Sequence, residues 1–179
     1  MRNKREDITF DASSLYTYEK MRRDLYMFEA CFPHMALNTA GISLDGRDIY
    51  EVIVGNRDAK RHILIQASIH GREYINTLLA MRQLKSFLEQ EEPMNEVCFH
   101  ILPMTNPDGV TISQRGPGAI RKPKLRSRLQ RCCKKDFKSI KAGNEGTVIP
   151  ESKYDEYWKR WKANARGVDL NRNFDSGWQ

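Results

Sequence analysis

The sequence lacks any hydrophobic run long enough to cross a membrane. Its 179 residues contain nothing near the ~20 consecutive apolar residues that a spanning helix needs. The basic start, residues 1–7, is followed by polar residues where a secretory signal would have its apolar segment. We therefore expect a cytoplasmic protein that does not interact with membranes.

Cysteines are few, and their spacing predicts neither a disulfide framework nor a Cys-x-x-Cys site. The four are Cys31, Cys98, Cys132 and Cys133, and the adjacent pair is poorly placed for an ordinary disulfide. This usage favours a reducing compartment. Internal repeats and low-complexity tracts are also missing, and the length favours a single domain.

Negative charge is nearly absent from one segment. Residues 121–141 hold ten Lys or Arg and the single Asp136, which gives +9, whereas the whole chain carries +7 and the remainder therefore −2. A solvated helix face is the favoured interpretation, and attraction to an anionic cell-wall polymer or to nucleic acid is the alternative. Because Phe137 is the only aromatic residue in this segment, base stacking is poorly supported, and a nucleic-acid binder is the least favoured of the alternative functions.

The first part of the chain predicts a helix and a hairpin. Thr17 is placed as an N-cap for a helix that Pro33 stops. Residues 41–44 and 49–54 then form two apolar runs around Asp45-Gly46, a dipeptide that readily takes the positive φ angles of a tight turn. We predict an antiparallel hairpin here.

A βαβ unit follows. Residues 62–69 and 97–102 are predicted as strands, and residues 73–92 as the helix between them. Such strands are parallel, so their carboxyl ends lie on the same edge of the sheet. The end of the first strand should therefore lie near the turn predicted at 106–109. The fold class is α/β, with a mixed twisted sheet and flanking helices.

Beyond residue 110 the pattern loosens into a long basic and partly helical excursion. Helices are predicted at 124–141 and 154–164, and Trp158 and Trp161 are expected to pack in the interior. So long an excursion after a strand edge is usually surface structure around a site.

His70 and Glu73 stand three residues apart where the run 62–69 gives way to a helix. Zinc binds imidazole nitrogen and carboxylate oxygen, and a catalytic zinc keeps one position open. At such a corner both side chains can point into the crevice where open α/β sheets bind ligands. The pair is a candidate for two zinc ligands, although a strand-end histidine beside a glutamate that favours the helix dipole gives the same spacing.

Three motifs in this order resemble the zinc carboxypeptidases of the carboxypeptidase A type. They are His70-x-x-Glu73, Asn106-Pro-Asp-Gly109 and Gly167-Val-Asp-Leu-Asn-Arg-Asn-Phe174. Gly71-Arg-Glu-Tyr74 and Trp161-Lys-Ala-Asn-Ala-Arg-Gly167 are more similar to the bacterial γ-D-glutamyl-meso-diaminopimelate peptidases. The resemblance implies a phosphorylase/hydrolase-type fold that is incomplete at the C-terminus, with this chain as the N-terminal half. A single truncated peptidase domain is then expected over 1–179, made of a core at 15–109, the excursion at 110–166 and a carboxylate-binding motif at 167–179.

The resemblance also implies roles for particular residues. His70 and Glu73 match two zinc ligands, so the implied cofactor is Zn²⁺. Asp169 matches the carboxylate that accepts a proton from the zinc-binding histidine and fixes its tautomer. Asn171 and Arg172 match the pair that binds the terminal carboxylate of the substrate, where a guanidinium makes two parallel hydrogen bonds.

The resemblance also implies a catalytic arginine, for which the sequence offers three candidates. Arg121 lies fifteen residues after Asn106, which is the family's interval to the arginine that stabilises the oxyanion. Arg115 or Arg126 could fill the role instead.

The implied function is that of a zinc metallopeptidase that cleaves peptides, in particular cell-wall (murein) stem peptides. The family's second zinc histidine, catalytic glutamate and substrate-covering tyrosine have no counterpart after Arg172, so the chain alone is expected to be inactive. His62 opens the strand that ends near His70, and His100 lies mid-strand like a hydrogen-bonded core residue, so neither is expected as the third ligand.

Two other functions stay open. One is a conventional metallocarboxypeptidase that removes C-terminal residues. The other is a noncatalytic module that retains the carboxylate-binding site. The implied partner is a peptide with a free carboxylate, and an open apolar sheet edge would be liable to self-association.

Overall fold

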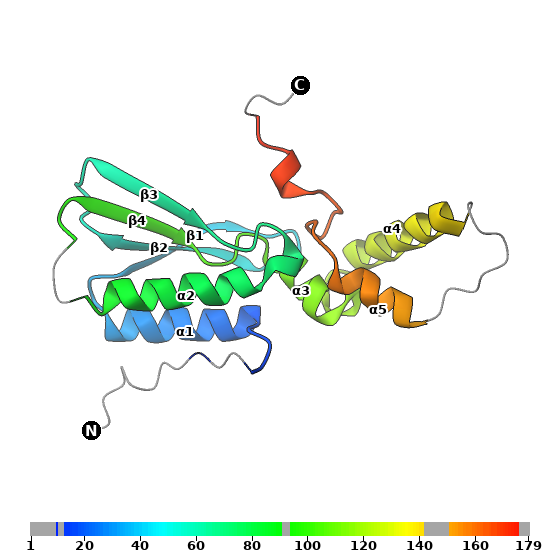
Figure 1. The fold of residues 1–179 in the computed structure, drawn as a ribbon, viewed down its shortest axis with the longest axis horizontal. Coiled ribbons are helices and arrows are strands. Elements are labelled where there is room, and N and C mark those ends of the chain that lie inside the picture. The colour runs from blue at the N-terminus through cyan, green and yellow to red at the C-terminus, as the bar shows by residue number, and fades with distance from the viewer. Residues whose placement is uncertain (1–9, 11–12, 91–93, 142–150, 176–179) are drawn as a thin grey trace. The chain divides into compact units, whose positions relative to one another are not determined.

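The computed structural model describes residues 10, 13–90, 94–141 and 151–175 (Figure 1), and the structural statements below concern these residues. They divide into two compact units, which are described separately. The first unit comprises 1–42, 48–68 and 74–105, and the second comprises 43–47, 69–73 and 106–179. No described helix is both long and apolar enough to cross a membrane.

The first unit is built on a mixed four-stranded sheet with the order β1-β2-β4-β3. Its strands are β1 (Ala36–Ile42), β2 (Asp48–Gly55), β3 (Arg61–Gln66) and β4 (Val97–Leu102). The β1/β2 and β2/β4 pairs are antiparallel, and β3/β4 is parallel. The predicted hairpin and the predicted parallel pair are both confirmed, as is the α/β fold class.

Helices α1 (Tyr18–Cys31) and α2 (Ile75–Leu88) lie on one face of this sheet (Figure 1). The Tyr18 ring stacks on Tyr50 of β2, and the Phe87 ring stacks on Phe99 of β4, with centroids 4.4 Å apart in the second pair. Thr17 caps α1 as predicted, because its hydroxyl accepts from the Lys20 N–H. The core between helices and sheet is fully buried and includes Leu25, Phe28, Val52, Met81 and Ile101.

Several predicted element boundaries in this region were wrong. The strand predicted at 41–44 is β1, which spans Ala36–Ile42, and the strand predicted at 62–69 is β3, which ends at Gln66. The helix predicted from Glu73 begins at Ile75, because the Glu73 N–H bonds to the His70 carbonyl and closes a separate 3-10 turn. It ends at Leu88 instead of 92, and the Glu89 N–H closes its last turn by donating to the Lys85 carbonyl.

The second unit is mainly helical. It contains α3 (Pro107–Arg115), α4 (Pro123–Lys141), α5 (Glu151–Lys159) and short 3-10 helices at Gly71–Glu73, Pro117–Ala119 and Leu170–Arg172. Its core cluster includes Ile112, Ile120, Leu129, Cys133, Trp158, Trp161 and Ala165. The two tryptophans are therefore packing residues, as predicted. The basic side chains of α4 whose exposure is described lie mostly on its solvated side.

Two predictions in the second unit need correction. The turn predicted at 106–109 is the start of α3, because Asn106 is its N-cap and Pro107 takes the first helical position. The helix predicted at 154–164 ends at Lys159, where the Arg160 N–H is shared between two carbonyls and the last turn tightens. The segment 168–174 contains the 3-10 helix Leu170–Arg172, where the Asp169 carboxylate accepts the Asn171 N–H.

Candidate functional site

The candidate site begins at the 3-10 turn that carries His70 and Glu73. This turn brings the two side chains together, with His70 Nδ1 3.0 Å from Glu73 Oε1. Two donors that bind one tetrahedral zinc at ~2.0–2.1 Å are ~3.3 Å apart. The observed separation is close to that value, and the His70 side chain is 15% exposed. The pair therefore fits two ligands of one cation.

Asp169 holds the other nitrogen of the same imidazole. His70 Nε2 lies 3.1 Å from Asp169 Oδ1, so an Nε2–H donor leaves the Nδ1 lone pair directed at Glu73. The same Oδ1 also accepts the Asn171 N–H at 3.0 Å. One carboxylate oxygen thus joins the imidazole to the turn that carries Asn171 and Arg172.

Asn106 fixes the backbone around this turn. Its side-chain oxygen accepts the Gly109 N–H at the start of α3. Its amide nitrogen donates to the carbonyls of Ile69, Lys162 and Ala163 at 3.0, 3.3 and 3.2 Å. The prediction that residues 106–109 lie beside His70 and Glu73 is confirmed.

The close approach of two backbones explains two glycines. A Cβ on Gly71 would collide with the backbone of Gly109, and a Cβ on Gly109 would lie 2.6 Å from the Ala163 carbonyl. The Gly71 N–H also donates to the Lys162 carbonyl at 3.0 Å. The turn that carries His70 and Glu73 therefore packs against α3 and the loop after α5.

A buried charge cluster that the sequence analysis did not identify lies in the same unit. Arg47 Nη1 donates to Asp45 Oδ2 at 2.6 Å and to Asp108 Oδ1 at 2.9 Å, and all three side chains are at most 2% exposed. Asp108 also accepts from the Ser43 hydroxyl and the Asp45 N–H. The residues that could have indicated this cluster in the sequence are the two aspartates and the arginine, which stand in motifs that we interpreted as turns.

The pKa of Asp45 is set by opposing effects. Burial alone would raise this pKa. The backbone N–H groups of Arg121 and Lys122 and the Arg47 guanidinium outweigh burial and hold the pKa below its ordinary value. Asp45 is therefore a charged anchor for the chain between α3 and α4.

The structure places Arg121 at this anchor. Its N–H donates to Asp45 Oδ2 at 2.9 Å, and its side chain is exposed. Among the described residues, no ion pair joins the Arg121 guanidinium to Glu73 or Asp169, whose carboxylates both contact His70.

Asn171 and Arg172 lie in the 3-10 turn Leu170–Arg172 with exposed side chains. The Arg172 N–H donates to the Asp169 carbonyl at 3.1 Å. The segment is held from the other side by Asn164, whose side-chain oxygen accepts the N–H groups of Arg166 and Val168. These bonds fix the turn and leave both predicted carboxylate-binding side chains accessible.

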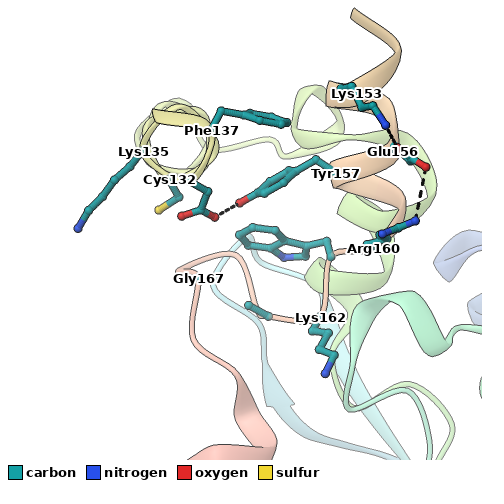
Figure 2. A pocket seen from close by; sticks show the side chains of 12 residues that line it. Cys132, Lys135, Phe137, Lys153, Glu156, Tyr157, Arg160, Lys162 and Gly167 are labelled. Carbon is teal, nitrogen blue, oxygen red and sulfur yellow. Dashed lines mark hydrogen bonds and ion pairs between the residues drawn. The ribbon is translucent and has the colours of Figure 1, made fainter. Parts of the chain in front are cut away.

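A hollow of about 690 Å³ lies between α4, α5 and the loop after α5 (Figure 2). The Tyr157 hydroxyl donates to Asp136 at 2.6 Å, and burial, followed by this hydrogen bond, raises the pKa of Tyr157. Glu156 pairs with Lys153 and Arg160. None of the site residues predicted from the sequence lines this hollow.

The zinc carboxypeptidase family profile matches residues 21–179, so the chain belongs to the zinc carboxypeptidase family. Among curated proteins it is similar to the γ-D-glutamyl-L-diamino acid endopeptidase 1 of Lysinibacillus sphaericus, with 26% identity over 92% of this chain and 39% of that protein. It is also similar to the uncharacterized protein YqgT of Bacillus subtilis strain 168, with 23% identity over 98% of this chain and 44% of that protein. The chain thus spans less than half the length of these relatives.

Solved structures support the same fold. The carboxypeptidase A of Helicoverpa armigera matches with a TM-score of 0.58 and 24% identity, over 94% of this chain and 36% of that one. The bovine thrombin-activatable fibrinolysis inhibitor matches with a TM-score of 0.58 and 16% identity, over 92% and 45%. At these identities the likeness shows the fold alone.

Proposed function

We propose that this chain provides the metal-binding and carboxylate-binding part of a zinc peptidase that cleaves cell-wall (murein) stem peptides. The observation that carries the proposal is the shared geometry of His70, Glu73 and Asp169, which sets one imidazole between a second metal donor and an orienting carboxylate. The similarity to a γ-D-glutamyl-L-diamino acid endopeptidase supports the substrate class.

His70 and Glu73 are the residues that would hold the zinc. When bound, zinc supplies Lewis acidity to the scissile carbonyl and to the attacking water. Asp169 would keep the His70 proton on Nε2, which leaves the Nδ1 lone pair free to bind the metal.

Asn171 and Arg172 would bind a carboxylate of the peptide. Both side chains are exposed, and a guanidinium makes two parallel charge-assisted hydrogen bonds to a carboxylate. Arg121 is proposed to bear the oxyanion that develops during hydrolysis, where a positive charge stabilises the transition state more than the ground state.

Zinc titration with a chromophoric competitor chelator tests the metal site. Relative to the unmodified chain, His70→Ala/Glu73→Ala should lose one equivalent of bound zinc, whereas His34→Ala, which changes an exposed histidine, should keep it. Equal zinc content in all three proteins would refute the assignment of His70 and Glu73.

The carboxylate site is tested by peptide binding. Arg172→Ala should weaken the binding of a peptide with a free C-terminal carboxylate by roughly 10- to 100-fold, as expected for a lost charge-assisted pair. Arg166→Ala, which changes an exposed arginine of the same segment, is the matched control. If the amidated peptide binds as well as the free acid, Asn171 and Arg172 are not a carboxylate site.

Hydrolysis separates the candidate activities. Two protein donors hold zinc weakly, so we propose that the 179-residue chain alone turns over far below the ~1–10³ s⁻¹ of ordinary enzymes. Residual cleavage should favour a γ-D-glutamyl-diamino acid stem over a plain peptide. Preferential release of C-terminal residues from the plain peptide would indicate a conventional metallocarboxypeptidase. Carboxylate binding that persists after chelation, without any hydrolysis, would indicate a noncatalytic module.

We also propose that β3 can recruit a second copy of this chain. In the described sheet β3 has a hydrogen-bonded neighbour on one side only, and Ile63 and Leu64 are 43% and 60% exposed. Edge strands with exposed apolar side chains favour pairing between molecules.

A further inference from the structure

Three metal-binding side chains from β3 and β4 meet on one face of the sheet in the first unit. His62 is the registered partner of Cys98 in the parallel pair, and partners on neighbouring strands are ~4.8 Å apart with side chains on the same face. His100 follows Cys98 by two residues on β4 and so points to that face as well. Phe99 lies between them in sequence and stacks on Phe87 of α2. The three side chains therefore point away from α1 and α2.

The donor atoms of these residues converge. His62 Nδ1 lies 2.9 Å from His100 Nε2, and Cys98 Sγ lies 3.8 Å from the same His100 nitrogen. All three donor atoms lie within 4.8 Å of one another. Around one tetrahedral ion with Zn–N of ~2.0–2.1 Å and Zn–S of ~2.3 Å, donors are ~3.3–3.6 Å apart, so small side-chain rotations bring the three to one centre.

Glu51 orients the central imidazole. Its Oε1 lies 2.9 Å from His100 Nδ1, and the His100 and Glu51 side chains are 27% and 24% exposed. When Nδ1–H donates to this carboxylate, the Nε2 lone pair is directed at His62 and Cys98. A carboxylate behind a histidine is the usual arrangement around protein metal ligands.

We infer that His62, Cys98 and His100 form a second metal site, for a borderline-soft divalent transition-metal ion such as Zn²⁺, with Glu51 as a positioning residue. Two imidazoles and a thiolate match the donor preference of Zn²⁺ rather than that of Mg²⁺ or Ca²⁺. A bound ion would link β3 to β4 and hold the edge strand in the sheet. The site is independent of His70 and Glu73.

Cobalt substitution tests the site, because a thiolate bound to Co²⁺ gives a sulfur-to-metal charge-transfer band that oxygen and nitrogen ligands do not give. The experiment uses the full chain carrying His70→Ala/Glu73→Ala, so that the other candidate site does not contribute. We expect one equivalent of Co²⁺ to produce the band, and Zn²⁺ to displace it. Absence of the band at saturating Co²⁺ would overturn the inference.

Matched variants locate the ligands in the same background. Cys98→Ser and His62→Ala should abolish the band or the binding, whereas Cys31→Ser and His34→Ala, which alter residues outside the cluster, should leave both unchanged. Glu51→Gln should weaken Co²⁺ binding ~10- to 100-fold while keeping the band, as for other residues that orient a ligand. Circular dichroism establishes that each variant is folded. A band that survives Cys98→Ser in a folded protein would refute the assignment.

Metal-dependent stability is a second readout. Because the ion would bind the folded chain and not the unfolded chain, saturating Zn²⁺ should raise the melting temperature of the His70→Ala/Glu73→Ala protein. The rise should vanish when Cys98→Ser is added. An equal rise in both proteins would show that the stabilising zinc binds elsewhere.

Discussion

At the scale of single residues, the stability of the second unit depends on a buried charge cluster. Its members are Asp45, Arg47 and Asp108. A charge removed from water is costly unless its partners replace the lost solvation, and removing one partner of a buried pair typically costs ~3–5 kcal/mol. Here each carboxylate accepts several hydrogen bonds besides the Arg47 guanidinium. The cluster is therefore stable only while every member is charged and present.

Asp45→Asn should reduce the free energy of unfolding by ~3–5 kcal/mol at neutral pH, because it leaves Arg47 with an incompletely compensated buried charge. Urea unfolding measures the loss, and Asp175→Asn, which changes an exposed residue, is the control. A loss no larger than that of the control would show that the cluster contributes little.

The same cluster predicts acid sensitivity. The pKa of Asp45 is lowered in the folded chain from an ordinary value of 3.8, so the folded state binds fewer protons than the unfolded state as the pH falls. The associated stability is fully present above pH ~4 and is lost as the pH falls through the lowered pKa. Asp45→Asn should flatten the dependence of the urea midpoint on pH below 4; an unchanged dependence would contradict this origin.

Asp169 contacts the Nε2 nitrogen of His70, and the separation of these two residues in the sequence does not by itself predict this contact. Asp169→Asn should lower zinc affinity at the His70 site ~10- to 100-fold, because an amide does not enforce the Nε2–H tautomer of the ring. Competition titration in a His62→Ala/Cys98→Ser background isolates this site, with Asp175→Asn as the control. Unchanged zinc affinity would mean that Asp169 stabilises the 3-10 turn and does not affect metal binding by His70.

At the scale of elements, the sequence predicted the strands and helices better than it predicted their ends. The hairpin and the parallel β3/β4 pair followed from apolar runs, whose periodicity is a local property. The start of α3 was missed because Asn106-Pro107 favours both a turn and a helix N-terminus, and tertiary bonds from Asn106 select the second.

The candidate site shows the same division. His70 and Glu73 share a short local spacing that a 3-10 turn converts into proximity. The group of Asp45, Arg47 and Asp108, and that of His62, Cys98 and His100, depend on side chains from distant segments. Strand register and tertiary hydrogen bonds determine which side chains from distant segments come into contact, and no local sequence pattern predicts these contacts.

The contact between the His70 turn and α3 gives a prediction about glycine. Gly109→Ala should lower the melting temperature by several degrees, since overpacking typically costs ~1–3 kcal/mol and ~1 kcal/mol shifts a chain of this size by ~2–4 °C. Gly118→Ala is the matched control, because nothing lies within 4 Å of its added Cβ. Similar melting temperatures for both variants would argue against the close approach.

For the molecule as a whole, we predict that the unpaired edge of β3 in the described sheet promotes self-association. Leu64→Lys should reduce concentration-dependent association, since a lysine on an edge strand opposes pairing with another chain. Leu79→Lys, at an α2 position that is 64% exposed, adds the same charge away from the edge. Sedimentation velocity over a range of concentrations measures the association of both variants. Equal association of the two would show that the β3 edge does not mediate it.

The single Asp169 oxygen that bonds to both His70 and the Asn171 backbone has a thermodynamic consequence. An ion bound at the proposed His70 site should also order the turn that presents Arg172, so the metal and a carboxylate ligand should each increase the affinity for the other by the same factor. Such reciprocity is required of any two ligands whose sites share one constrained element. It would make loading of the chain cooperative before any bond is cleaved.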